Sequence, residues 1–127
     1  MPFIDVRNQA TGEPLPGWHD RYFASQFMSF AYYDVDAGAS IHAHSHDEEE
    51  VWHIVEGTLE ITIEGETVVA SEGTAAVVPP NSVHSVKART NARVIIANHP
   101  TRERIVRRFS RKSCAAVASA PSGCAPV

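Results

Sequence analysis

The chain has 127 residues, of which 43% are hydrophobic and 20% are charged, and its formal net charge is −4. This length fits one domain with one hydrophobic core, and the composition is typical of a folded globular protein rather than a disordered one. The longest apolar runs are far shorter than the roughly 18 residues of a membrane-spanning helix, and the N-terminus lacks a secretory signal pattern. We therefore expect a cytoplasmic, single-domain protein with no membrane partner.

Pro14, Pro16 and Gly17 interrupt the start of the chain, which predicts an N-terminal arm over residues 1–20 with little regular structure. From Tyr22 onward, short runs rich in Val, Ile and Thr alternate with turn signals. The predicted strands cover residues 30–35, 40–46, 51–55, 58–64, 67–70, 75–78, 83–88 and 93–98. Only residues 101–109 carry a short helical pattern. So many short strands indicate a β-sandwich or barrel, which we place at residues 21–110.

Three alternating histidines, His42, His44 and His46, share one face of a predicted strand, because residues two apart on a strand project to the same side. After a predicted hairpin turn, Glu50 begins the returning strand opposite them. Imidazoles and a carboxylate together form a donor set for one transition metal ion. His84 follows a Pro-Pro turn, and a barrel can bring its strand alongside to supply another nitrogen.

These residues resemble the two motifs of the cupin family. The first motif matches in every spacing at Gly38, His44, His46, Glu50 and Gly57. The second matches at Gly73, Pro79 and His84, but Asn81 stands where the family has glycine and Ala88 where it has asparagine. Asparagine tolerates a positive φ, so Asn81 can still form the turn, and Ala88 lies outside the ligand set.

The resemblance covers about residues 24–100 and implies an all-β, double-stranded β-helix, which is the jelly-roll barrel of the cupins. It further implies one divalent transition metal (iron, manganese, nickel, zinc or copper) held by His44, His46, Glu50 and His84. Cupins with this ligand set include dioxygenases, isomerases, decarboxylases, lyases and non-catalytic binding proteins. The resemblance therefore leaves the reaction open.

Our first functional hypothesis is a metal-dependent enzyme, best described as a dioxygenase, whose substrate is a small oxygenated organic molecule. Glu50 then serves as a metal ligand and as a catalytic proton carrier. One alternative is an isomerase or lyase that uses the metal without oxygen. Another is a cupin that binds a small molecule and does not transform it.

Further residues are candidates for contacting the metal ligands or the substrate: His42, Trp52, Tyr32, Phe30 and Met28. The alternative for His42 is a hydrogen bond at the barrel rim, and for the others an ordinary core position. Glu48 and Glu49 compete with Glu50 for the ligand position, and the motif spacing favours Glu50. His53 and His99 are expected to be structural or solvated.

Charge is unevenly distributed along the chain. Residues 1–101 carry five Lys or Arg against fourteen Asp or Glu, whereas residues 102–127 carry six against one. The basic cluster at residues 102–112 lacks a base-reading element, so we expect no nucleic-acid binding and favour attraction to the acidic body or a dimer contact. The exposed edges of a two-sheet barrel predict a homodimer. Residues 111–127 are expected to form a flexible tail, in which Cys114 and Cys124 are incidental thiols.

Overall fold

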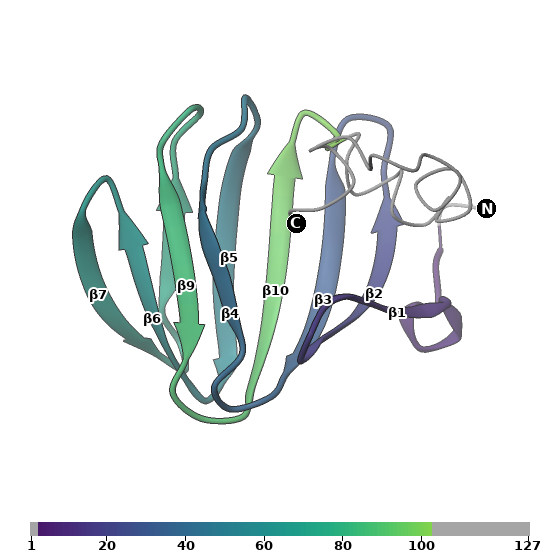
Figure 1. The fold of residues 1–127 in the computed structure, drawn as a ribbon. Helices are drawn as coiled ribbons and strands as arrows, with labels where there is room; N and C mark the ends of the chain where they lie inside the picture. Colours follow the sequence, from purple (N-terminus) through teal and green to yellow (C-terminus); the bar gives the residue numbers. More distant parts are fainter. Residues whose placement is uncertain (1–2, 103–127) are drawn as a thin grey trace, which may run out of the picture.

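The structure is a computed structural model, and its description covers residues 3–102. The elements in this range are η1 (Val6–Asn8), β1 (Thr11–Leu15), β2 (Trp18–Ala24), β3 (Ser29–Val35), β4 (Ser40–His44), β5 (Glu49–Glu56), β6 (Thr58–Ile63), β7 (Glu66–Ser71), β8 (Ala75–Val78), β9 (His84–Ala88) and β10 (Ala92–His99). A six-stranded sheet has the order β1-β2-β3-β10-β5-β8, and a four-stranded sheet has the order β4-β9-β6-β7 (Figure 1). The predicted all-β fold of short strands is confirmed.

Side chains alternate between the core and the outer surface along the strands. In β3, Ala31, Tyr33 and Val35 are buried, whereas Tyr32 and Asp34 between them are exposed. The same period of two runs through β10, where Val94 and Ile96 are buried. This alternation gives the six-stranded sheet one face that packs against the four-stranded sheet and another that faces outward.

Aromatic rings hold the centre of the core. Trp18 is fully buried and meets Tyr33 and Trp52 edge to face, with ring centroids 5.4 and 5.8 Å apart. Leu59 and Ile61, on β6 of the four-stranded sheet, belong to the same buried cluster. Edge-to-face pairs add about 0.5–1.5 kcal/mol each beyond the burial of their apolar area. The core therefore joins the two sheets through residues that lie close to the predicted metal ligands.

A β-bulge in β4 changes the expected alternation. Ile41 pairs with Val86 and His44 pairs with His84, so two residues of β4 lie opposite one residue of β9. The extra residue reverses the parity, because each added residue turns the following side chains to the other face. Ile41 is therefore buried and His42 is exposed. The ring centroid of His42 nonetheless lies 5.8 Å from that of His44, so the role of His42 beside the metal ligands stays a prediction.

The predicted N-terminal arm is more regular than expected. Residues 11–20 form β1 and the start of β2, because the glycine turn at Gly17 returns the chain so that Trp18 can enter the core. The predicted tail at residues 111–127, both cysteines and most of the basic cluster lie outside the described residues. Within residues 3–102, no helix is long and apolar enough to cross a membrane.

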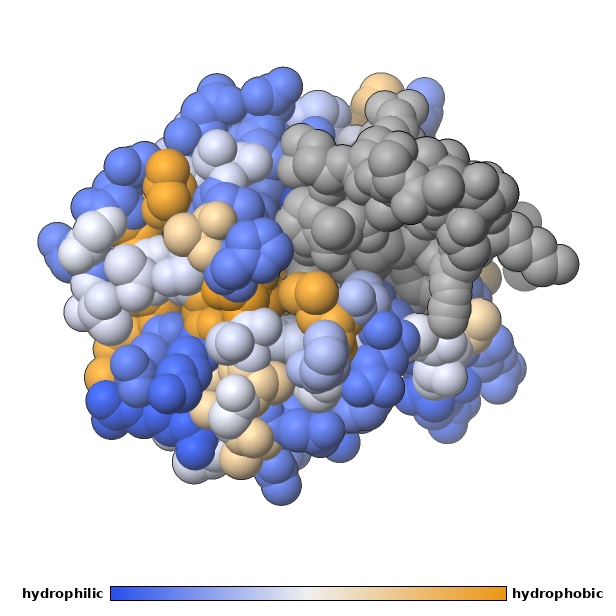
Figure 2. Space-filling view, in the orientation of Figure 1, coloured by the Kyte–Doolittle hydropathy of each residue, from blue (hydrophilic) through white to orange (hydrophobic). Residues whose placement is uncertain are grey.

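Apolar side chains are exposed at two sheet edges. Val68 and Val69 lie on β7 and Val77 lies on β8, and these are edge strands of the two sheets. Figure 2 shows apolar surface, in orange, on the side where Figure 1 places β7, interrupted by hydrophilic surface. Exposed apolar edges suit contacts with another chain. The homodimer stays a prediction.

Gly57 provides a test of the turn between β5 and β6. Its φ is +85°, and an added Cβ would collide with the carbonyl oxygen of Asn91 and lie 2.8 Å from Cα of Ala92. We expect Gly57→Ala to lower the free energy of unfolding by about 2–4 kcal/mol, because the strained backbone and the collision add. Gly65, with φ +81° and open space around its Cα, is the matched control, and Gly65→Ala should cost only about 1 kcal/mol. Urea denaturation measures both, and equal losses would contradict the role of the collision.

Candidate metal centre

Three histidines from two segments meet inside the barrel. His44 ends β4, His46 lies in the following loop, and His84 begins β9. The His84 ring centroid lies 4.3 Å from that of His44 and 4.9 Å from that of His46. One nitrogen from each ring can be chosen so that all three lie within 4.8 Å of one another. The structure thus brings together the three predicted histidine ligands.

Backbone carbonyls orient the three rings. The Nδ1 atoms of His44, His46 and His84 lie 2.9, 3.1 and 2.8 Å from the carbonyl oxygens of residues 42, 48 and 82. A carbonyl only accepts hydrogen bonds, so each Nδ1 carries a hydrogen and donates it, and each neutral ring has its lone pair on Nε2. This is the arrangement that fixes metal-binding histidines in proteins. Among the described residues, the buried Nε2 atoms of His46 and His84 have no hydrogen-bond partner.

Glu50 completes the cluster from β5, where its side chain is buried. Its Oε2 lies 3.5 Å from Nε2 of His46, and its Oε1 lies 3.4 Å from Nε2 of His84. Trp52 donates its indole N–H to Oε1 over 2.6 Å, and Arg102 donates from Nη1 to Oε2 over 3.5 Å. The carboxylate is therefore held in place from one side by the indole and guanidinium groups and faces two imidazoles.

The electrostatic environment of the cluster favours binding of a cation. Burial lowers the pKa of His44 to about 4, so this ring is neutral at pH 7. Burial would raise the pKa of Glu50, but His46, His84 and the charge of Arg102 outweigh it and hold that pKa well below its usual range. For His84 burial lowers the pKa, but nearby Glu50 and the carbonyl of residue 82 reverse the direction and raise it. Glu50 thus favours positive charge at its position beside His84, as it would favour a cation bound there.

The donor set fits a divalent transition metal. Atoms bound to one such ion at about 2.1 Å lie about 3.0–3.4 Å apart at right or tetrahedral angles. The separations between Glu50 oxygens and histidine nitrogens, 3.4 and 3.5 Å, are close to this range. The buried, unpartnered Nε2 atoms of His46 and His84 supply the independent reason for an ion, since buried polar atoms rarely remain without a partner.

The other predicted pocket residues are divided between two faces of the six-stranded sheet. Trp52 points inward and contacts Glu50, although through a hydrogen bond rather than only as an apolar wall. Phe30 and Tyr32 lie on the outer face of β3, where both pack against Phe23 of β2, and they do not line the metal centre. That placement was mispredicted because the inward positions of β3 are the odd-numbered ones. Met28 lies in the β2–β3 turn and donates its backbone N–H to Ser25.

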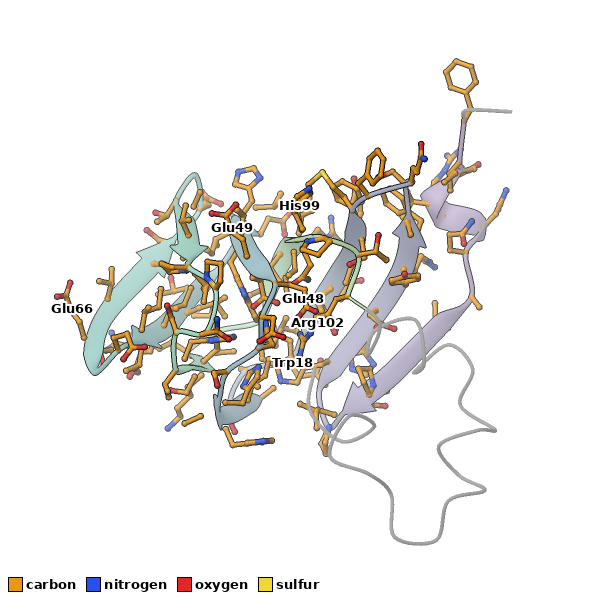
Figure 3. All side chains as sticks on the ribbon, turned by 90° about the horizontal axis from the view of Figure 1, so that it is seen from above. Trp18, Glu48, Glu49, Glu66, His99 and Arg102 are labelled. Carbon is orange, nitrogen blue, oxygen red and sulfur yellow. The ribbon has the colours of Figure 1, made fainter. Side chains whose placement is uncertain are left out.

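The remaining acidic and histidine candidates are not among the three clustered histidines. Glu49 is exposed and pairs across the strands with His99, and Figure 3 shows the two together. Glu48 is half-buried beside Nδ1 of His46 at 3.4 Å, so it adjoins the ligands without joining the Nε2 cluster. His53 faces outward from β5 and is exposed. His42 is exposed; its backbone carbonyl orients His44, and its ring centroid lies 5.8 Å from that of His44.

The sequence analysis did not identify two residues at the site, Arg102 and Asn98. Arg102 appeared only as the first member of a basic cluster, yet its side chain is fully buried, 3.5 Å from Glu50 and 3.9 Å from Glu48. Figure 3 shows Arg102 beside Glu48. Asn98 pairs directly with Glu50 across β10 and β5 and is also fully buried. The signal for Asn98 was available, because a polar residue at an inward position of a strand is unusual.

Asn81 connects the two motif segments. Its φ is +63°, so it takes the left-handed conformation expected of a residue that replaces glycine. Its N–H donates to the carbonyl of His46 over 2.7 Å. This bond fastens the turn before β9 to the loop that carries His46. The other departure from the motif, Ala88, is buried in the core.

The chain matches the family described as "Cupin domain" over residues 31–98, which is more than half of its length. The chain belongs to the cupin family. The jelly-roll barrel implied by the family resemblance is thereby confirmed, and the histidine cluster of this cupin lies where its two motif segments meet. Among curated proteins, no match to this cupin is found.

Solved structures with the same fold are similar over most of the chain. An RmlC-like cupin from Shewanella frigidimarina has 22% identity and a TM-score of 0.78, covering 83% of this chain and 96% of its own. KdgF from Halomonas sp. has 24% identity and a TM-score of 0.73, covering 79% and 94%. Oxalate decarboxylase from Bacillus subtilis has 18% identity and a TM-score of 0.67, covering 76% of this chain but 29% of its own. At these identities the likeness shows the fold alone.

Removing one imidazole tests the ligand set. We expect His84→Ala to weaken metal binding more than about 100-fold, because one of the three clustered, buried imidazole donors is lost. His53→Ala is the matched control, since His53 is an exposed histidine on β5. Metal content after dialysis, measured by mass spectrometry, should fall in the first variant alone. Full occupancy in His84→Ala would show that the ligand is misassigned.

Substitutions of the two buried tryptophans distinguish the effect of the hydrogen bond to Glu50 from the effect of core packing. We expect Trp52→Phe to weaken metal binding about 10–100-fold, because Glu50 loses the N–H that fixes Oε1. Trp18→Phe removes the same chemical group, here bonded to the carbonyl of Ser40 at 3.2 Å, without contacting Glu50. Chelator competition should therefore give near wild-type affinity for Trp18→Phe. Equal weakening in both variants would assign the effect to packing.

Proposed function

We propose that this cupin binds one divalent transition metal through His44, His46, His84 and Glu50 and uses it to transform a small oxygenated organic molecule. The observation that carries the proposal is the buried cluster of Nε2 atoms facing an ionised carboxylate. Iron, manganese, nickel, zinc and copper all accept such a donor set. A solved structure similar in fold, oxalate decarboxylase, is described as having Mn(II) centres, which makes manganese one ion to test.

The charge of the site supports a catalytic role. Three neutral imidazoles and one carboxylate leave a divalent ion with a net charge of about +1. When bound, such an ion supplies Lewis acidity that lowers the pKa of a coordinated hydroxyl, enol or water, and iron adds reactivity with oxygen. The chain itself excludes bulk water, since His46, His84 and Glu50 are all buried.

Glu50 is also our candidate for moving a proton. Oε1 is held by the short bond from Trp52, whereas Oε2 has only the longer contacts to Arg102 and His46. We therefore assign proton acceptance from the substrate to Oε2. The lowered pKa keeps the carboxylate ionised, so it can take up a proton only when its contacts to His46, His84 and Arg102 loosen during the reaction.

Dioxygenase activity is the reaction class that we propose first, because enediols, diketones and phenolic acids can bind a metal through neighbouring oxygens. The test uses protein purified without added metal and then loaded separately with iron and manganese. Metal content and oxygen consumption are measured against a panel of those compounds, and we expect substrate-dependent oxygen uptake by the wild type.

The His84→Ala variant serves as the control with a defective metal site. Oxygen uptake that persists in this variant would contradict a role for the cluster. Substrate conversion in the absence of oxygen would replace the dioxygenase proposal with an isomerase or lyase. Tight binding of a compound without any conversion would identify a binding protein instead.

A further inference from the structure

The outer face of the six-stranded sheet carries a row of apolar side chains that crosses five neighbouring strands. Phe30 of β3 pairs directly with Phe23 of β2 and with Ala97 of β10, and the row continues through Val51 of β5 to Val77 of β8. Directly paired residues project to the same side of a sheet. These five residues, which we call the apolar row, therefore lie together on the side of the sheet that faces away from the core.

The central strands have the composition of strands that are covered on both faces. In β10 four consecutive residues, 94–97, are apolar, whereas a strand with one face in water alternates between apolar and polar residues. Their outward members, Ile95 and Ala97, are nonetheless partly exposed. In the same face Tyr32 is 38% and Val77 is 55% exposed. An apolar surface that spans several strands marks a site of contact with another molecule.

A row of charged side chains crosses the same face farther along the strands. Asp34 of β3 pairs with Arg93 of β10, which pairs with Glu56 of β5. Nε of Arg93 lies 3.0 Å from Oδ1 of Asp34, and its Nη1 lies 3.6 Å from Oε1 of Glu56. His19 of β2 ends this charged row and is bonded through Nε2 to Asp36 over 3.0 Å. The charged row thus alternates in sign from strand to strand.

The face is hollowed between η1 and the strands. A cavity of about 420 Å³ lies there, and its lining includes Val6 of η1 together with Tyr32, Val55, Arg93 and Ile95 of the sheet. Because this cavity opens beside the apolar row, the face has room for side chains from another molecule.

The charge of the face favours a second copy of this chain as the partner. Apart from histidines, the outward charged residues of the four central strands are two arginines and three carboxylates, namely Arg21, Arg93, Asp34, Glu49 and Glu56. On η1, Arg7 is paired with Asp5. A face so close to neutral gives little attraction to residues 103–127, which lie outside the described residues and carry five Lys or Arg against one Glu. A surface with alternating charges can instead match itself.

The strand order shows how the face would match itself. A twofold axis parallel to the strands and between β3 and β10 places β3 opposite the second copy's β10, and β2 opposite its β5. The apolar row then meets the apolar row, with Phe30 opposite Ala97, so that a large side chain meets a small one. In the charged row, Asp34 meets Arg93 and Arg93 meets Asp34. A twofold axis across the strands would instead bring the apolar row toward the charged row.

We propose that two copies of this chain pack face to face through the outer surface of their six-stranded sheets, about a twofold axis that runs along the strands between β3 and β10. Strands about 4.8 Å apart with about 3.3 Å per residue give this face a flat area of roughly 500 Å². Protruding side chains raise its accessible area toward the roughly 800 Å² per partner of a stable interface. The apolar row supplies the binding energy, and the charged row supplies the register.

Size-exclusion chromatography with light scattering on the full chain tests the contact. We expect the wild type to have about 28 kDa, twice the 13.9 kDa of one chain. Ala97→Glu and Val77→Glu should each weaken dimerisation at least about 100-fold, because an unpaired carboxylate would be buried in the interface. Val68→Glu is the matched control, since Val68 is 52% exposed on β7 at the edge of the other sheet, and this variant should stay dimeric. Circular dichroism checks that each variant is folded.

Three results would overturn the proposal. A monomeric wild type would leave residues 103–127 as the candidate for covering the face. A dimer that Val68→Glu disrupts and that Ala97→Glu and Val77→Glu leave intact would place the contact at the β7 edge. A dimer that survives all three substitutions would exclude both surfaces.

Cross-linking tests the direction of the axis without disturbing the apolar row. Arg21 of β2 lies opposite His53 of the second copy's β5 in the proposed arrangement, whereas two copies of Arg21 lie about three strands, or roughly 14 Å, apart across the sheet. Chains with Arg21→Cys and with His53→Cys, each also carrying Cys114→Ser and Cys124→Ser, are co-expressed and treated with a short bis-maleimide. We expect cross-linked dimers from the mixture and few from either chain alone. The reverse pattern would contradict this axis.

Discussion

The carboxylate of Glu50 is the point at which the core, the metal centre and the end of the described chain meet. Burying a carboxylate costs several kcal/mol unless other groups compensate it. Here the compensation comes from the indole of Trp52, the guanidinium of Arg102 and two imidazoles. Each of these groups must occupy its position for the charge to be tolerated. The constraint therefore extends from the coordination site into the aromatic core, because Trp52 also packs edge to face against Trp18.

Strand order explains how these groups come together. β5 lies between β10 and β8 in the six-stranded sheet, so Glu50 has Asn98 on one side and Val78 on the other. The histidines come from the opposite sheet and from the loop that joins the two sheets after β4. The site is thus built across the interior between the sheets. A cation placed there would reinforce the contact between them, since binding to the folded state alone stabilises that state.

Much of this arrangement could be predicted because the relevant sequence patterns lie within short stretches of the chain. Period-two alternation and turn residues located the strands from β3 onward within one or two residues but missed β1 and β2, and the motif spacing located the three clustered histidines and Glu50. The exposure of His42 could not be predicted, since a bulge depends on pairing with β9 and leaves no mark in β4 alone. Phe30 and Tyr32 were misplaced for a related reason: alternation separates two faces but does not say which is inside. Arg102 lay beyond prediction because its partners are more than fifty residues away.

Because of the bulge between Ile41 and His44, the number of residues in this segment, rather than the identity of its side chains, decides which residues face inward. His42 and Ala43 are both exposed, so many side chains would fit at these positions. Deleting either residue would restore simple alternation and force a choice between two costs. Either Ile41 would leave the core, or His44 and His46 would turn away from His84 and Glu50. Relatives that share this centre should therefore vary freely in sequence at these two positions and yet conserve their number.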